Sequence, residues 1–192
     1  MTIKTSMAAV IAAVTASVGT AALAQVSSYA GQEQHDIKSL SPLEVTALLT
    51  GQGAGFAKAA ELNGYPGPAH VVELADQLML SPDQLQKSRQ LMDEHKERAR
   101  RLGAEVVAAE RALDRLFGEQ RAEAAAVASA AERVGLLQAR LRTEHLNTHL
   151  LQTAVLSMEQ VRRYGELRGY TVDSAPGVAT PKKDSTDHHK PH

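Results

Sequence analysis

Apolar side chains recur at alternating steps of three and four along the middle of the chain, the spacing of one face of a helix. The first stripe predicts a long helix from Pro82 to Phe117, and a similar stripe predicts a second from Glu119 to about Val155. The positions of the first stripe are Leu85, Ser88, Met92, His95, Ala99, Leu102, Val106, Ala109, Leu113 and Leu116. A short connection makes two long amphipathic helices antiparallel neighbours, so the pattern predicts a helical hairpin.

Shorter helices are expected on both sides of this pair. Capping and turn residues predict them at residues 41–51, at residues 69–79 and at residues 157–168. The expected fold class is therefore all-α, a long antiparallel helical hairpin with shorter flanking helices.

The N-terminal residues have the pattern of an export signal. Lys4 precedes an apolar run of small residues, and an A-x-A site ends at Ala24, which predicts cleavage there and a periplasmic protein. The expected organisation is a signal peptide (1–24), a flexible segment (25–39), a helical domain (40–170) and a disordered tail (171–192). Within the domain, residues 40–68 form a unit of short helices and turns, and residues 69–168 form the hairpin.

Composition narrows the function classes. The chain has no cysteine, which excludes disulfides and thiolate metal sites, and its net charge of −1 argues against nucleic-acid binding. Gly51, Gly53 and Gly55 suggest a phosphate loop, but no strand precedes them and no Gly-Lys-Ser/Thr follows, so a plain loop is expected. No nucleophile–base set is visible, which predicts a protein that is not an enzyme. After signal cleavage no remaining apolar run reaches bilayer length.

One short phrase occurs twice, as "LSPDQLQK" from Leu80 and "LSMEQVRR" from Leu156. In each copy a serine can cap the next helix, and a glutamine three residues later can reach back to the serine backbone, which is a capping box. The preceding leucine suits a hydrophobic staple. The residues are Leu80, Ser81 and Gln84 in one copy and Leu156, Ser157 and Gln160 in the other. In an antiparallel hairpin both copies lie at its open end.

This duplicated motif resembles the Leu-Thr-x-x-Gln motif of the Spy/CpxP superfamily, with serine in place of threonine. "LADQLMLSPDQLQKSRQLMDEH" and "LLQTAVLSMEQVRRYGEL" carry the resemblance, over roughly residues 71–168. Relatives include ZraP and the CnrX-type heavy-metal sensors. The resemblance implies a bent helical hairpin that dimerises into a thin, curved cradle. In one branch this surface holds unfolding clients without ATP, and in another a similar hairpin binds metal and regulates an envelope signalling partner.

Three histidines are candidate metal ligands. His145 and His149 lie one helical turn apart, and His95 lies roughly opposite them on the predicted seam. With Glu94 or Glu144 nearby, they could form a mixed nitrogen and oxygen site for Zn, Ni, Co or Cu. The alternative is that these side chains only make structural hydrogen bonds. No other cofactor is expected.

Two functions from different classes follow. The first is a periplasmic, ATP-independent chaperone-like or envelope-stress adaptor protein, a homodimer that binds unfolded clients or a signalling protein, with Met79, Leu91 and Met92 as partner-binding residues. The second is a heavy-metal sensor or metal-resistance protein that uses the three histidines. A structural envelope protein that only dimerises is a third alternative.

Overall fold

The computed structural model of the chain describes residues 26–170. These residues form a short 3₁₀ helix at Gln32–Gln34, six α-helices and no strand, so the predicted all-α class is confirmed. The expected signal peptide with its cleavage site at Ala24, and the expected tail, lie outside the described residues. Across residues 26–170, no helix is long and apolar enough to span a membrane.

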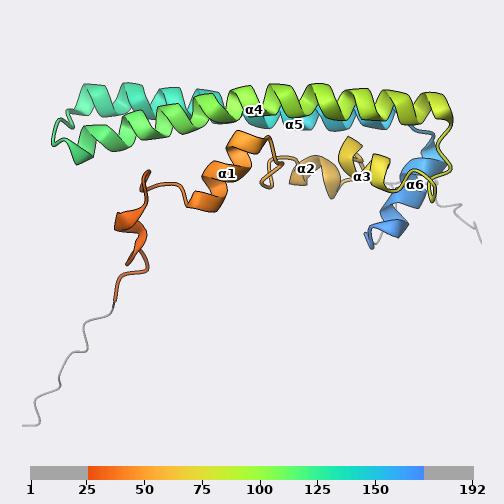
Figure 1. Cartoon of the computed structure of the whole chain (residues 1–192), viewed down its shortest axis with the longest axis horizontal. Helices are drawn as coiled ribbons and strands as arrows, with labels where there is room; N and C mark the ends of the chain where they lie inside the picture. The colour runs from red at the N-terminus through yellow and green to blue at the C-terminus, as the bar shows by residue number, and fades with distance from the viewer. Residues whose placement is uncertain (1–25, 171–192) are drawn as a thin grey trace, which may run out of the picture.

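Two long helices dominate the molecule, α4 (Pro82–Gly118) and α5 (Ala124–Val155). They lie side by side along most of their length (Figure 1). Hydrogen bonds between the two helices join residues whose sequence separation falls steadily toward the connecting loop, so α5 runs antiparallel to α4. These bonded pairs are Ser88 with Gln152, His95 with Glu144, and Glu110 with Gln138.

Two predicted helix boundaries were wrong. The second long helix begins at Ala124 rather than Glu119, because Gln120 has a φ of 53° and turns the chain out of α4. The helix expected at residues 69–79 is α3 (Pro68–Glu73), followed by turns that end with Met79 at a φ of 48°. A side-chain-bearing residue in this left-handed region cannot continue a right-handed helix.

Shorter elements lie along one side of the α4–α5 pair (Figure 1). They are α1 (Pro42–Thr50), α2 (Lys58–Glu61), α3 and α6 (Met158–Leu167). Gly103 of α4 permits a close contact with α1. A Cβ atom at this position would lie 2.1 Å from the carbonyl oxygen of Leu48, so only glycine allows α1 to approach α4 this closely.

Part of the segment expected to be flexible is instead packed against α4. Ile37 is only 1% exposed and belongs to the main hydrophobic core. Asp36 accepts a hydrogen bond from Arg111, and Ser39 donates one to Glu110 across 2.8 Å. The sequence showed no period here because one apolar side chain anchors this irregular segment.

Both copies of the repeated motif form capping boxes in the structure. The Ser81 hydroxyl accepts from the Gln84 backbone N–H, and the Ser157 hydroxyl accepts from the Gln160 backbone N–H. A second hydrophobic core, formed by Val71, Leu78 and Tyr164, lies beside these caps, and Leu80 and Leu156 pack against it.

Candidate functional site

A cavity of about 510 Å³ lies between the α4–α5 pair and the short elements beside it. Its walls come from the loop between α1 and α2, from α2, from the start of α3, from one side of α4 and α5, and from Arg168 after α6. All three predicted metal ligands line this cavity. The fold therefore brings His95, His145 and His149 to the same cavity, as their spacing in the sequence suggested.

His95 is held in one orientation by its neighbours on α5. Its Nδ1 atom lies 3.1 Å from Glu144 Oε1 and 3.0 Å from Thr148 Oγ1. Because a carboxylate accepts, Nδ1 carries the hydrogen and Nε2 keeps its lone pair. Burial lowers the pKa of His95 by more than Glu144 raises it, so the ring is neutral at physiological pH.

Glu144 is the anion of this group. Burial alone would raise the pKa of its carboxyl, but hydrogen bonds from Arg98 and His95 outweigh burial and hold that pKa below its usual range. Arg98 Nε donates to Glu144 Oε1 across 2.8 Å. Glu144 is therefore ionised, and its Oε1 atom lies within hydrogen-bond distance of donors on His95, Arg98 and Thr148.

His145 is the most buried of the three histidines, with 3% of its surface exposed. Its ring stacks on Phe56 at a centroid distance of 5.6 Å and meets the His95 ring edge-on at 4.6 Å. Burial, with smaller contributions from the neighbouring imidazoles, lowers the pKa of His145 to about 4. Its buried Nε2 atom has no hydrogen-bond partner among the described residues.

His149 reaches out of α5 to the turn before α3. Its Nδ1 atom donates to the backbone carbonyl of Tyr65 across 2.7 Å. The ring lies directly over Gly67, where a Cβ atom would come within 2.8 Å of it. The "GYPGP" turn thus fits against this histidine, a relationship that only the fold shows.

Glu61 is a residue of this site that sequence reasoning missed. Its Oε1 atom accepts hydrogen bonds from the hydroxyls of Tyr164, at 2.5 Å, and Tyr170, at 3.0 Å. Its Oε2 atom lies 3.7 Å from His149 Nδ1 and has no hydrogen-bond partner among residues 26–170. Nothing near Glu61 in sequence marks it, since its partners lie about a hundred positions away.

The site gathers the His95, His145 and His149 imidazoles around one cavity. No group of three or more His, Asp or Glu side chains within residues 26–170 is arranged to hold a metal ion. Glu94, the other carboxylate considered, instead accepts from Gln90 and Arg98 on α4.

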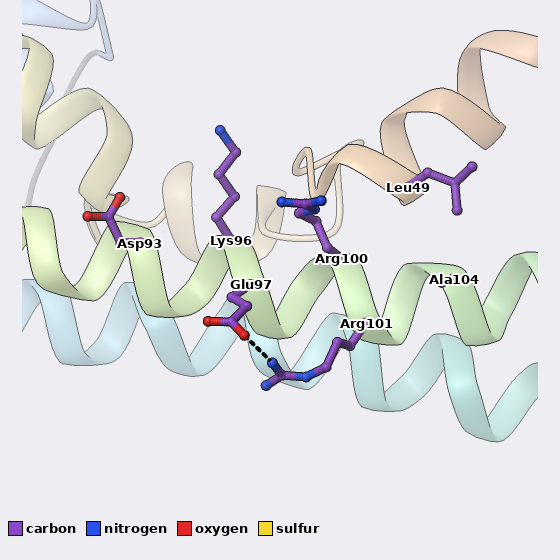
Figure 2. Close-up of a pocket in the computed structure, with 7 residues that line it drawn as sticks. All are labelled: Leu49, Asp93, Lys96, Glu97, Arg100, Arg101 and Ala104. Carbon is purple, nitrogen blue, oxygen red and sulfur yellow. Dashed lines mark hydrogen bonds and ion pairs between the residues drawn. The ribbon is translucent and has the colours of Figure 1, made fainter.

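A second depression, of about 640 Å³, lies along α4 next to Leu49 of α1. Figure 2 shows Lys96 and Arg100 extending from α4 toward the neighbouring short elements, while Glu97 and Arg101 pair with each other at 2.7 Å. Lys96 lines both this depression and the main cavity, so positive charge lies between the two.

The predicted partner-binding residues lie in different environments. Met79 is 84% exposed at the end of the α4–α5 pair where the caps meet. Leu91 and Met92 are half-buried, and Met92 lines the cavity. A second exposed methionine, Met158, is 87% exposed and directly follows the Ser157 cap.

In comparisons with known proteins, no family model, no curated protein and no solved structure matches the chain.

Proposed function

We propose that this protein is a periplasmic, ATP-independent chaperone-like or envelope-stress adaptor protein. It binds unfolding or signalling partner proteins on its helical hairpin, and it acts by binding rather than by catalysis. The observation that supports this best is the pair of exposed methionines, Met79 and Met158, beside the joined caps. Methionine is flexible and polarisable, which suits a surface that must accept many different apolar partners.

Met79 carries a further argument. Its backbone lies in the left-handed region with a φ of 48°, which is uncommon for a residue with a side chain. The turn that holds it there also directs its side chain into solvent. A backbone outlier of this kind costs free energy, so its presence favours a role for the exposed side chain.

The experiment is suppression of aggregation of a thermally unfolding test protein, without ATP and at several temperatures. We expect suppression at near-stoichiometric amounts, and we expect the double variant M79E/M158E to lose most of it. The matched control is Leu43→Glu, because Leu43 is 78% exposed on α1, far along the sequence from the caps. Absence of suppression by the unmodified protein at every temperature would overturn the proposal.

The dimer implied by the resemblance is part of the same proposal. Within residues 26–170 the short helices all lie on one side of the α4–α5 pair (Figure 1), which leaves a long face for a second copy. Light scattering on the eluting protein would measure its mass. We expect twice the mass of one chain, and a mass of one chain at all concentrations would contradict the dimer.

A second candidate function is binding of Zn, Ni, Co or Cu, as in a metal sensor or resistance protein. It is favoured by one observation, that His95, His145 and His149 line the same cavity. Calorimetry with each metal tests it on the full chain and on the variant H145A/H149A, so that histidines elsewhere are common to both samples. Identical isotherms for the two chains would remove this candidate.

A further inference from the structure

The cavity has the size of a small-molecule site. At about 510 Å³ it falls within the range of organic ligand pockets, whereas a bare metal ion needs only the space between its ligands. Part of its lining is apolar and comes from Met92, Ala54 and Pro68. This lining suits the hydrocarbon part of a ligand.

The charges around the cavity favour an anion. Lys58 and Lys96 line it, and neither forms an ion pair with any residue between 26 and 170. The carboxylate in the lining, Glu61, lies 3.8 Å from Arg168 and accepts from two tyrosine hydroxyls at Oε1, while its Oε2 has no hydrogen-bond partner among residues 26–170. Lys58, Lys96 and Arg168 against Glu61 therefore leave the cavity lining with a net positive charge.

A buried histidine adds an unpaired polar atom beside the cavity. His145 is 97% buried, since 3% of its surface is exposed, and it lines the cavity with Nε2 unpaired. A buried polar atom without a partner is costly, and a bound ligand oxygen would relieve that cost. A neutral imidazole can present its N–H to such an oxygen.

From these three observations we propose that the cavity binds a small organic anion, a carboxylate on a compact hydrocarbon body. The carboxylate lies between the Lys58 and Lys96 ammonium groups and the His145 imidazole, and the hydrocarbon part packs against Met92. A phosphate group has the same anionic chemistry and is distinguished by the test. A divalent cation is disfavoured, because both lysines would repel it and no ligand set is arranged to receive it.

The test is titration calorimetry on the full chain, freed of metal with a chelator, near neutral pH and at constant ionic strength set with chloride. The probes are benzoate, succinate, inorganic phosphate, Zn²⁺ and uncharged benzamide. We expect saturable binding of benzoate or succinate and none of benzamide. Saturable binding of phosphate alone would support the anion site and assign it to a phosphate-bearing ligand. No saturable anion binding, or saturation with Zn²⁺ only, would overturn the proposal.

Variants locate the binding. We expect K58Q/K96Q to weaken carboxylate binding about tenfold or more, since each charged hydrogen bond is worth at least that factor. The matched control is Lys87→Gln, another lysine of α4, whose partner is Asp83 and which does not line the cavity. Equal weakening by both variants would show non-specific attraction and contradict the assignment. Partner binding at Met79 and Met158 is tested separately, because neither methionine lines this cavity.

Discussion

Gln84 and Gln160 bond to each other through both of their side-chain amides. Gln84 Nε2 donates to Gln160 Oε1 across 2.9 Å, and Gln160 Nε2 donates to Gln84 Oε1 across 3.1 Å. Each Oε1 also accepts the backbone N–H of its own capping serine. Each Nε2 also donates to a backbone carbonyl, that of Val155 for Gln84 and that of Leu78 for Gln160. The repeated motif thus joins the two caps to each other.

This pairing explains why both motifs use glutamine. A capping box accepts glutamate equally well, and the box of α1 does use Glu44. Only an amide can donate and accept at once, which the reciprocal bond requires.

We therefore expect Gln84→Glu to lower the free energy of unfolding by about 1–3 kcal/mol, because it removes two donated hydrogen bonds and places a carboxylate against carbonyl oxygens. The reverse change at the exposed cap, Glu44→Gln, is the matched control and should cost well under that amount. Urea unfolding followed by circular dichroism measures both. Equal losses for the two variants would show that the glutamine pair contributes nothing beyond capping.

Two glycines on the long helices should respond oppositely to the same substitution. Gly103→Ala places a methyl group 2.1 Å from the Leu48 carbonyl, so α1 must move, and we expect destabilisation of about 1–3 kcal/mol. Gly135→Ala on α5 meets no atom within 4 Å and should stabilise the helix by about 0.5–1 kcal/mol. Thermal unfolding of the two variants measures both signs, and a loss at Gly135 equal to that at Gly103 would contradict the close contact with α1.

Acidification should destabilise the protein through the buried imidazoles. The pKa of His145 is about 4 in the folded protein, whereas it is about 6.5 in the unfolded chain. The unfolded chain therefore binds the proton first, and stability falls as the pH decreases from about 6.5 toward 4. The loss from His145 is at most on the order of 3 kcal/mol, and His95 shifts in the same direction.

Urea unfolding midpoints measured across this pH range test this effect. The midpoint of the His145→Gln variant should depend less steeply on pH than that of the unmodified protein. His70→Gln is the control, since that side chain lies outside the buried ring cluster and pairs with Glu73. Unchanged slopes for both variants would show that the buried ring does not govern acid stability.

The Tyr164 hydroxyl connects the last helix to the cavity wall. We expect Tyr164→Phe to loosen α6, because the hydroxyl donates to the Glu61 carboxylate at 2.5 Å and such a charged hydrogen bond contributes about 1.5–3 kcal/mol. Hydrogen exchange of the α6 backbone amides should become faster. Tyr29→Phe, at a tyrosine that is 72% exposed, is the control and should leave exchange unchanged.

Local patterns predicted the elements whose causes are local. The Ser81 and Ser157 caps follow from side chains within three residues, and the long helices follow from a periodicity repeated over many turns. The predicted end of the first long helix at Phe117 lies one residue before the observed end at Gly118. The length of the following loop was not predicted, because the left-handed turn occurs at Gln120, a residue type with no strong preference for it.

The site was predictable only in part. His95, His145 and His149 could be grouped because helix geometry and an antiparallel arrangement fix their neighbourhood. Glu61 and Lys58 could not be added, since their positions depend on how an irregular segment folds back over the long helices. The exposure of Met158 could not be predicted either, because it depends on how α6 packs.

The central claim, that partners bind beside the joined caps, is tested most directly by site-specific photocrosslinking. A photoreactive amino acid replaces Met79 in one chain and Leu43 in another, and each is irradiated with a thermally unfolding test protein. Both positions are exposed, at 84% and 78%, so access to the probe is matched. We predict crosslinks to the unfolding protein from position 79 and few from position 43. Equal yields from the two positions, or none from position 79, would contradict the account.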